Sequence, residues 1–240
     1  MLSIATAVAG SAGAGVDPGL HIPDGFMSTP IAIAGWVVTI AVVALAARMA
    51  NRSLNERAVP LMGVMAAFIF AAQMMNFPVA GGTSGHMLGG ALAAILLGPW
   101  AAIIVMTAVV GLQAFLFQDG GIAVLGVNIF NMGILTALVG YGIYRGFQLA
   151  TGARGAMALF AAFVAAWVTV EGAAVLTAVQ LALSDTSPLD VALPAMVGVH
   201  ALIGIGEGLI TAAALGFIMS TRADLLPDYA RDAASATARP

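Results

Sequence analysis

Seven apolar runs, separated by short polar loops, constrain the fold of this chain more than any other feature. A helix needs roughly 20 apolar residues to cross the hydrocarbon core of a bilayer. We expect helices at about residues 30–50, 59–75, 86–97, 98–117, 122–144, 156–183 and 191–220. Of the 240 residues, 61% are hydrophobic and 8% are charged, against roughly 25% charged in soluble domains. The sequence therefore predicts an all-α, multi-pass membrane protein with seven transmembrane helices.

The connections between the runs alternate in charge. The connections after the first and fifth runs hold Arg with one acid, Glu56, and the seventh run ends at Arg222. The connections after the second, fourth and sixth runs hold Asp or no charge. Because Arg marks cytoplasmic loops, this pattern predicts an N-terminus outside and a C-terminus inside. We divide the chain into a small-residue leader at 1–19, a membrane domain at 20–222 and a polar, disordered cytoplasmic tail at 223–240.

The residue types that the chain lacks exclude several functions. It has no Cys, which excludes disulfides and thiolate metal sites. It has no Lys, which excludes a P-loop lysine and a lysine Schiff base. Any ATP hydrolysis that drives transport therefore belongs to another chain. The net charge of -3 and the eight scattered Arg residues do not favour nucleic-acid binding.

Two of the three histidines are expected at the outer face. His21 precedes the first run, and His86 lies where the third run enters the membrane from outside. A loop histidine at a membrane surface is more often simply solvated, and this alternative stays open for His21. The surroundings of His86, "GGTSGHMLGG", favour a functional residue, because irregular backbone at membrane depth lines a polar cavity or is buried in protein.

Other polar residues fall inside the apolar runs. Ionisable groups there are functional candidates by default, although ordinary packing hydrogen bonds are the alternative. His200 and Glu207 are seven residues apart and share a helical face. Two asparagines in "GVNIFNMG" are expected to form hydrogen bonds between helices. These candidates are Asn128, Asn131, Glu171, His200 and Glu207.

Four motifs in order resemble those of the CbiM/NikM family, the substrate-binding membrane components of energy-coupling factor transporters for cobalt and nickel. They are "HIPDGFMS", "NFPVAGGTSGHMLGGALAAILLGPW", "FQDGGIAVLGVNIFNMG" and "HALIGIGEG", and the likeness runs from about residue 20 to 222. The resemblance implies a six-helix core with an additional N-terminal helix, which agrees with the seven apolar runs.

The resemblance also implies a planar nitrogen site for the metal. Carried over to this chain, its ligands are the amide nitrogen and imidazole of His21, the imidazole of His86, and the amine of Leu20 if the chain begins there. Fused chelate rings and four nitrogens in a plane suit Ni(II). Nitrogen ligands also discriminate against Mg(II) and Ca(II), which prefer oxygen. Nickel and cobalt both remain open as the transported ion.

Several residues are expected to support this site. Pro23, Asp24 and Gly25 make a tight turn that folds the N-terminal segment toward His86, with Asp24 capping that turn. Further residues would orient the imidazole through hydrogen bonds. These are Asn76, Thr83 and Ser84.

The N-terminus departs from the family pattern, in which the chain begins Met-His. Here nineteen residues precede Leu20. Three explanations compete: a cleaved signal peptide, a persisting leader with another group completing the site, or initiation with Met at codon 20. The leader lacks a basic n-region, and Leu20 stands directly before His21. We therefore favour initiation at codon 20.

By the resemblance, the chain captures Ni(II) or Co(II) outside a bacterial or archaeal cell membrane and is not itself an enzyme. The partners implied are a membrane coupling subunit, two cytoplasmic ATPases and a small accessory membrane subunit. Small residues at four-residue spacing form a candidate docking face, with packing inside the chain's own bundle as the alternative. They are Gly63, Ala67 and Ala71.

Two other classes of function would need different residues. An intramembrane metalloenzyme typically needs a His-Glu-x-x-His motif, which the sequence lacks. A self-sufficient, ion-coupled metal transporter would use Glu171, His200 and Glu207 as a relay. Metal uptake without any partner ATPase would distinguish that transporter from a substrate-binding component.

Overall fold

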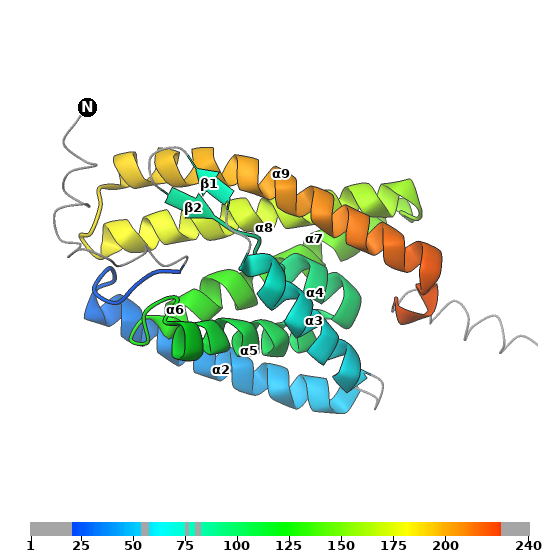
Figure 1. Cartoon of the computed structure of the whole chain (residues 1–240), viewed down its shortest axis with the longest axis horizontal. Helices are drawn as coiled ribbons and strands as arrows, with labels where there is room; N and C mark the ends of the chain where they lie inside the picture. The colour runs from blue at the N-terminus through cyan, green and yellow to red at the C-terminus, as the bar shows by residue number, and fades with distance from the viewer. Residues whose placement is uncertain (1–20, 54–57, 75–76, 80–82, 227–240) are drawn as a thin grey trace, which may run out of the picture.

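A computed structural model describes residues 21–53, 58–74, 77–79 and 83–226 (Figure 1). Its helical segments follow the seven apolar runs, with the fifth run divided among three consecutive segments. The first four are α2 (Thr29–Ser53), α3 (Ala58–Gln73), α4 (Gly90–Leu97) and α5 (Pro99–Phe117). The fifth run forms α6 (Leu125–Ile129), the π-helix η1 (Phe130–Leu135) and α7 (Thr136–Thr151). The last two runs are α8 (Ala156–Leu183) and α9 (Leu189–Thr221).

Five helices in the described part of the chain are long and apolar enough to cross a membrane, namely α2, α5, the continuous segment Leu125–Thr151, α8 and α9. The multi-pass, helical fold class is therefore confirmed. Helix α3 has 16 residues and α4 has eight. Eight residues rise only about 12 Å, so α4 does not span the bilayer core alone. The number of fully crossing helices and their orientation stay predictions.

The third predicted helix begins later than expected. His86–Gly89 is not helical, and α4 starts at Gly90 because Gly89 adopts a left-handed conformation with φ of 81°. Before this segment, β1 (Phe77–Val79) and β2 (Thr83–Gly85) pair antiparallel. This small hairpin is a departure from the purely helical prediction, in a Gly-rich stretch that no helix-period pattern fills.

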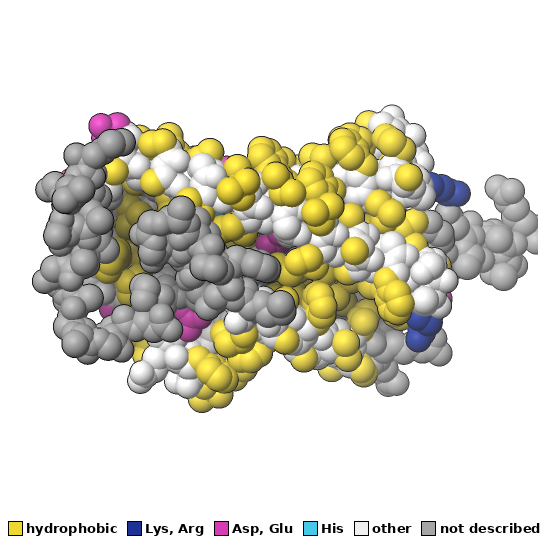
Figure 2. Space-filling model, turned by 45° about the horizontal axis from the view of Figure 1, so that its top comes forward, with side chains coloured by type: hydrophobic (Ala, Val, Ile, Leu, Met, Phe, Trp, Pro, Cys, Tyr) yellow, Lys and Arg dark blue, Asp and Glu magenta, His cyan; other side chains and the backbone are white. Residues whose placement is uncertain are grey.

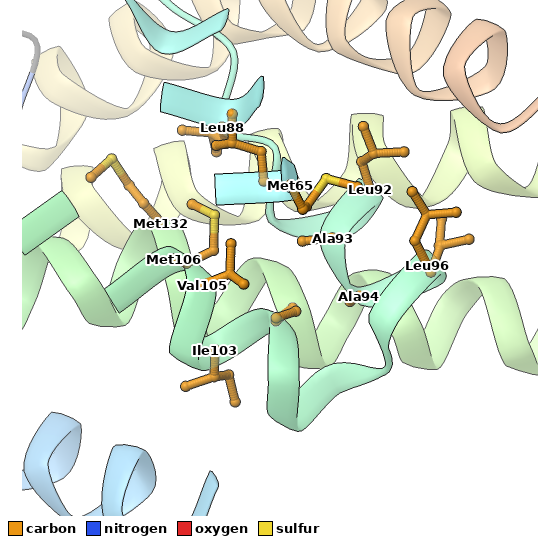
Figure 3. Close-up of a cluster of buried hydrophobic side chains, with 14 of the residues drawn as sticks. Met65, Leu88, Leu92, Ala93, Ala94, Leu96, Ile103, Val105, Met106 and Met132 are labelled. Atoms are coloured by element: carbon orange, nitrogen blue, oxygen red, sulfur yellow. The ribbon is translucent and has the colours of Figure 1, made fainter. Parts of the chain in front are cut away.

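Helix α4 lies inside the bundle. Seven of its eight residues are buried, and Figure 3 shows Leu92, Ala93 and Leu96 from α4 in one cluster with Met65 and Met106. Close helix contacts depend on small residues. A Cβ added at Gly90 would fall 1.8 Å from the Thr136 hydroxyl oxygen, so only glycine fits there.

Helices α8 and α9 pack along much of their length, side by side in Figure 1. Aromatic rings of α8 pack against glycines of α9. A Cβ added at Gly204 would lie 2.9 Å from the Trp167 ring, and a Cβ added at Gly208 would lie 2.6 Å from the Phe163 ring. The glycines therefore permit the close approach of the two helices. Apart from α8 and the short turn at Ala223–Leu225 that follows α9 itself, the described helices and strands make only sparse contacts with α9.

The two ends of the bundle differ in charge. Arg side chains visible in Figure 2 lie at the end where α2 and α9 terminate, and acidic side chains gather mainly at the opposite end. Asp24 and Asp119 belong to the acidic end, in the segments before α2 and after α5. At the Arg end, a 3₁₀ turn, η2 (Ala223–Leu225), follows α9, and Leu226 is buried. Ordered structure thus extends four residues into the predicted tail, and the rest of that tail lies outside the described residues.

Candidate metal-binding site

The structure brings His21 and His86 together at the acidic end of the bundle. Their ring centroids are 5.2 Å apart, and the two rings meet at 76°. Both residues are buried, with exposed fractions of 4% and 7%. The Nε2 atom of His21 has no hydrogen-bond partner among the described residues. A buried polar atom without a partner costs about 1–3 kcal/mol, so it is a feature typical of a site that binds something.

His21 is fixed mainly by Asp119, which lies at the start of the loop between α5 and α6. The His21 main-chain N–H donates to Asp119 Oδ1 at 3.2 Å, and His21 Nδ1 lies 3.1 Å from the Asp119 carbonyl oxygen. Burial lowers the pKa of His21 below its usual value, although the Asp119 carboxylate and carbonyl oppose this effect. The neutral imidazole, which is the metal-binding form, is therefore favoured.

The backbone next to His21 is held by Asn128 of α6. Ile22 N–H donates to Asn128 Oδ1 at 3.2 Å, and Asn128 Nδ2 donates to the Ile22 carbonyl at 3.0 Å. The prediction of an interhelical hydrogen bond was therefore wrong for Asn128, because the non-helical backbone at Ile22 needs partners that a helix would supply for itself. For Asn131 it is confirmed, since its amide pairs with Gln180 and Thr177 of α8.

The predicted turn is present, but Asp24 acts elsewhere. Phe26 N–H donates to the Pro23 carbonyl, and Gly25 has φ of 90°. The Asp24 carboxylate instead accepts from three consecutive N–H groups just before α6, those of residues 122–124. The expectation that Asp24 caps its own turn was wrong. The N–H groups at the start of a helix lack intrahelical acceptors, and Asp24 supplies one.

His86 belongs to a short non-helical segment with its own supports. Its Nδ1 lies 2.8 Å from the Met87 carbonyl oxygen. The N–H groups of Leu88 and Gly89 donate to the two carboxyl oxygens of Glu207, at 2.5 and 2.8 Å. The Leu88 carbonyl accepts from Gln73 Nε2 at 2.7 Å. Both sides of this backbone are therefore satisfied by buried side chains from α3 and α9.

The structure describes only some of the other sequence candidates. Leu20 and Asn76 lie outside the described residues, as do the side chains of Thr83 and Ser84, whose backbone belongs to β2. His200 is half-buried and directs Nδ1 to the Met196 carbonyl of its own helix at 2.7 Å. It is close enough to His86 for an electrostatic interaction.

The small-residue face on α3 does not pack within the described bundle. Gly63, Ala67 and Ala71 are all exposed, and a Cβ at Gly63 would meet nothing within 4 Å. Apolar side chains flank this face, with Val64 67% exposed and Phe68 43% exposed. The structure thus leaves the α3 face open.

Three supporting residues were missed in the sequence. Asp119 stood only as a charge in a predicted outer loop, and Gln73 and Gln113 stood in apolar runs. Gln113 donates to Gln73 at 2.9 Å, and both are fully buried. A rule that treats every polar residue in an apolar run as a candidate, rather than only the ionisable ones, would have found the two glutamines.

Comparisons with known proteins agree with this fold. The CbiM family, described as "Cobalt uptake substrate-specific transmembrane region", matches residues 21–225. A relative from Haloquadratum walsbyi that is named for metal transport is 42% identical over 209 residues, covering 86% of this chain and 93% of its own. The fused nickel transport protein NikMN of Rhodobacter capsulatus is 33% identical, with 86% of this chain and 64% of that protein covered.

The solved structures include a similar transporter. The crystal structure of a truncated transition metal transporter is 36% identical and superposes with a TM-score of 0.76. The match covers 83% of this chain and 98% of that one. The family match over most of the chain, the relatives and the shared architecture establish that this chain belongs to the CbiM family of metal-transport membrane proteins.

Proposed function

We propose that this chain captures Ni(II) or Co(II) on the outer side of the membrane through His21 and His86. The single observation that carries the proposal is the pair of buried imidazoles in contact, with 5.2 Å between the ring centroids of His21 and His86. Burial that favours neutral His21 supports a ligand role, because a protonated imidazole cannot bind a metal.

The acidic end of the bundle suits the approach of a cation. Asp24, Asp119, Asp185 and Asp190 are the charged residues of the described segments there. A surface of one sign concentrates ions of the opposite sign and speeds their binding. The same charge pattern supports the prediction that this end faces outward, since the Arg end matches a cytoplasmic face.

Side chains complete only part of the proposed coordination. No group of three His, Cys, Asp or Glu residues in the described segments is arranged to hold a metal. We therefore assign the remaining ligands to nitrogen atoms of the backbone at His21 and to the amine of Leu20 in a chain that starts there. A chelate ring that includes the His21 amide nitrogen closes through Nδ1 of the same residue, and both of these nitrogens lie against Asp119. The amide nitrogen binds a metal only after it loses its proton, and Asp119 Oδ1 is the acceptor of that N–H at 3.2 Å.

Delivery of the metal is proposed to depend on other subunits, as part of an energy-coupling factor transporter. The absence of Lys excludes a P-loop lysine from this chain. ATP hydrolysis is therefore assigned to two cytoplasmic ATPases that act through a membrane coupling subunit, with a small accessory membrane subunit. The exposed face of Gly63, Ala67 and Ala71 on α3 is the surface that we assign to the coupling subunit.

Metal titration of the purified chain tests the site. His21→Ala and His86→Ala should each abolish high-affinity binding of Ni(II) and Co(II), with the melting temperature of the metal-free protein as a check on folding. His200→Ala is the matched control, because it removes the third histidine of the chain. Unchanged binding in His86→Ala would remove His86 from the site. Competition between the two metals in the same assay decides between nickel and cobalt.

Uptake in cells tests the mode of transport. We expect accumulation of radioactive nickel or cobalt to stop when the partner ATPases are deleted. Uptake that continues without them would favour the self-sufficient transporter that uses Glu171, His200 and Glu207. Glu207 is a weak candidate for such a relay, since both of its oxygens already accept backbone hydrogen bonds.

The intact mass of the natural protein tests initiation at codon 20, and a species that retains residues 1–19 would refute it.

A further inference from the structure

Glu207 makes an unusual contact for a residue in the middle of a transmembrane helix. It is 2% exposed, and its two carboxyl oxygens accept the successive N–H groups of Leu88 and Gly89. These groups belong to the non-helical segment that begins with His86. Two successive backbone N–H groups beside a left-handed residue form a concavity that binds anions. In this protein the occupant is a carboxyl group of the same chain.

The contact needs the residue types found on both sides. Gly89 has φ of 81°, and a Cβ there would lie 2.9 Å from two atoms of Ile69. Without glycine the two N–H groups would not present themselves together to Glu207. On the opposite side of the segment, Gln73 donates to the Leu88 carbonyl. The backbone that follows His86 is therefore fixed from two directions.

Helix α9, which carries Glu207, packs against other elements than those that hold His21. Helix α9 packs mainly on α8, and among the other described helices and strands it contacts chiefly α4, β2 and the turn η2. His21 is held by Asp119, and the next residue, Ile22, by Asn128; both partners come from the α5–α6 region. The two imidazoles therefore depend on different helices, and Glu207 forms the hydrogen bonds that connect α9 with the segment of His86.

We propose that Glu207 is a positioning residue that ties His86 to α9 and so sets the separation of the two imidazoles. The inference rests on the proposed function, in which both imidazoles bind the metal. Glu207 does not touch the metal, and its effect passes through the backbone of Leu88 and Gly89. A displacement of α9 relative to α6 would move His86 away from His21 and weaken the site.

Glu207→Gln tests this role in the purified full-length chain with Ni(II) alone as the probe. The amide keeps one acceptor and replaces the other with a donor, which faces an N–H group. Loss of a residue that orients a ligand lowers metal affinity about 10- to 100-fold. We expect that loss, together with a shifted absorption band of the bound Ni(II). Glu171→Gln is the matched control, because the same change in α8 alters a carboxyl group that has no hydrogen bond to the His86 segment among the described contacts.

The melting temperature of the metal-free protein separates positioning from general stability. A Glu207→Gln protein with a lower melting temperature but an unchanged Ni(II) affinity and absorption spectrum would overturn the proposal. The same holds if Glu207→Gln and Glu171→Gln have the same affinity and the same spectrum. Glu207→Asp serves if the Gln variant does not fold, since it keeps both acceptors on a shorter side chain, and an affinity and spectrum identical to the natural protein would again refute the role. His86→Ala tests the proposed function separately, because it removes the ligand itself.

Discussion

Gly120 is the residue whose substitution tests the geometry around His21 most directly. It has φ of 94°, and a Cβ there would lie 2.7 Å from His21 Cβ and 3.1 Å from Asn128 Nδ2. Two carbon atoms in contact are normally about 3.5–4.0 Å apart, so the added methyl overlaps His21 by roughly 1 Å. The overlap involves the base of the side chain, which cannot rotate away. Gly120→Ala therefore has to displace the backbone of His21.

The size of the effect follows from this overlap. Extra atoms forced into a packed site typically cost about 1–3 kcal/mol, and about 1.4 kcal/mol is a tenfold change in an equilibrium constant. If His21 is a ligand, metal binding must restore its position against this strain. The affinity for Ni(II) should then fall roughly 5- to 150-fold.

Gly25→Ala is the matched control for the backbone conformation. Gly25 has φ of 90°, close to that of Gly120, but a Cβ there would meet nothing within 4 Å. Left-handed strain of about 1–2 kcal/mol is common to both variants, whereas the collision with His21 is specific to Gly120→Ala. Isothermal titration with Ni(II) measures both affinities, and melting temperature measures both stabilities. Equal affinities in the two variants would refute the placement of His21 in the metal site.

Three further predictions concern the same end of the molecule. Asp119→Ala removes the acceptor of the His21 N–H, and we expect the Ni(II) affinity to fall about tenfold or more; an unchanged titration would exclude a supporting role for this carboxylate. Because burial lowers the pKa of His21, the unfolded chain binds more protons than the folded chain between that lowered pKa and about 6.5. The stability of the metal-free protein should therefore decrease as the pH falls through this window. Thermal melts at pH 7.5 and 5.5 measure this effect, and the melting temperature of His21→Gln should fall less between the two pH values than that of the natural protein. The chain has no Cys, so an impermeant maleimide applied to intact cells should label Asp190→Cys and not Arg154→Cys; the reverse pattern would invert the predicted orientation.

The helices were predictable from the sequence because a bilayer imposes a simple requirement on length and polarity. Six of the apolar runs correspond to α2, α3, α5, the continuous segment Leu125–Thr151, α8 and α9, with ends shifted by up to seven residues. The third run failed differently. The stretch of residues 86–97 is as apolar as a helix, but the left-handed Gly89 and the hydrogen bonds to Glu207 keep its first part non-helical. Hydropathy does not detect a turn that depends on tertiary contacts.

The site was predictable in part. The approach of His21 and His86 follows from topology, since both precede runs that enter from the same end. The partners of these histidines did not follow. Asp24 bonds to residues about 100 positions away, and Glu207 bonds to Leu88 at a separation of 119. No local sequence pattern specifies such distant pairs, so the prediction placed each side chain within its own turn or helix.

These misplaced partners share one physical cause. The segments around His21 and His86 are irregular, so their backbone N–H and C=O groups cannot pair within a helix and must find buried acceptors and donors. Asn128, Glu207 and Gln73 supply them. A polar residue in an apolar run is therefore to be matched with a Gly-rich, non-helical segment elsewhere in the chain before it is assigned to chemistry. By this criterion Glu207 supports the ligand segment, whereas Glu171, which has a buried oxygen without a partner among the described residues, has no such explanation.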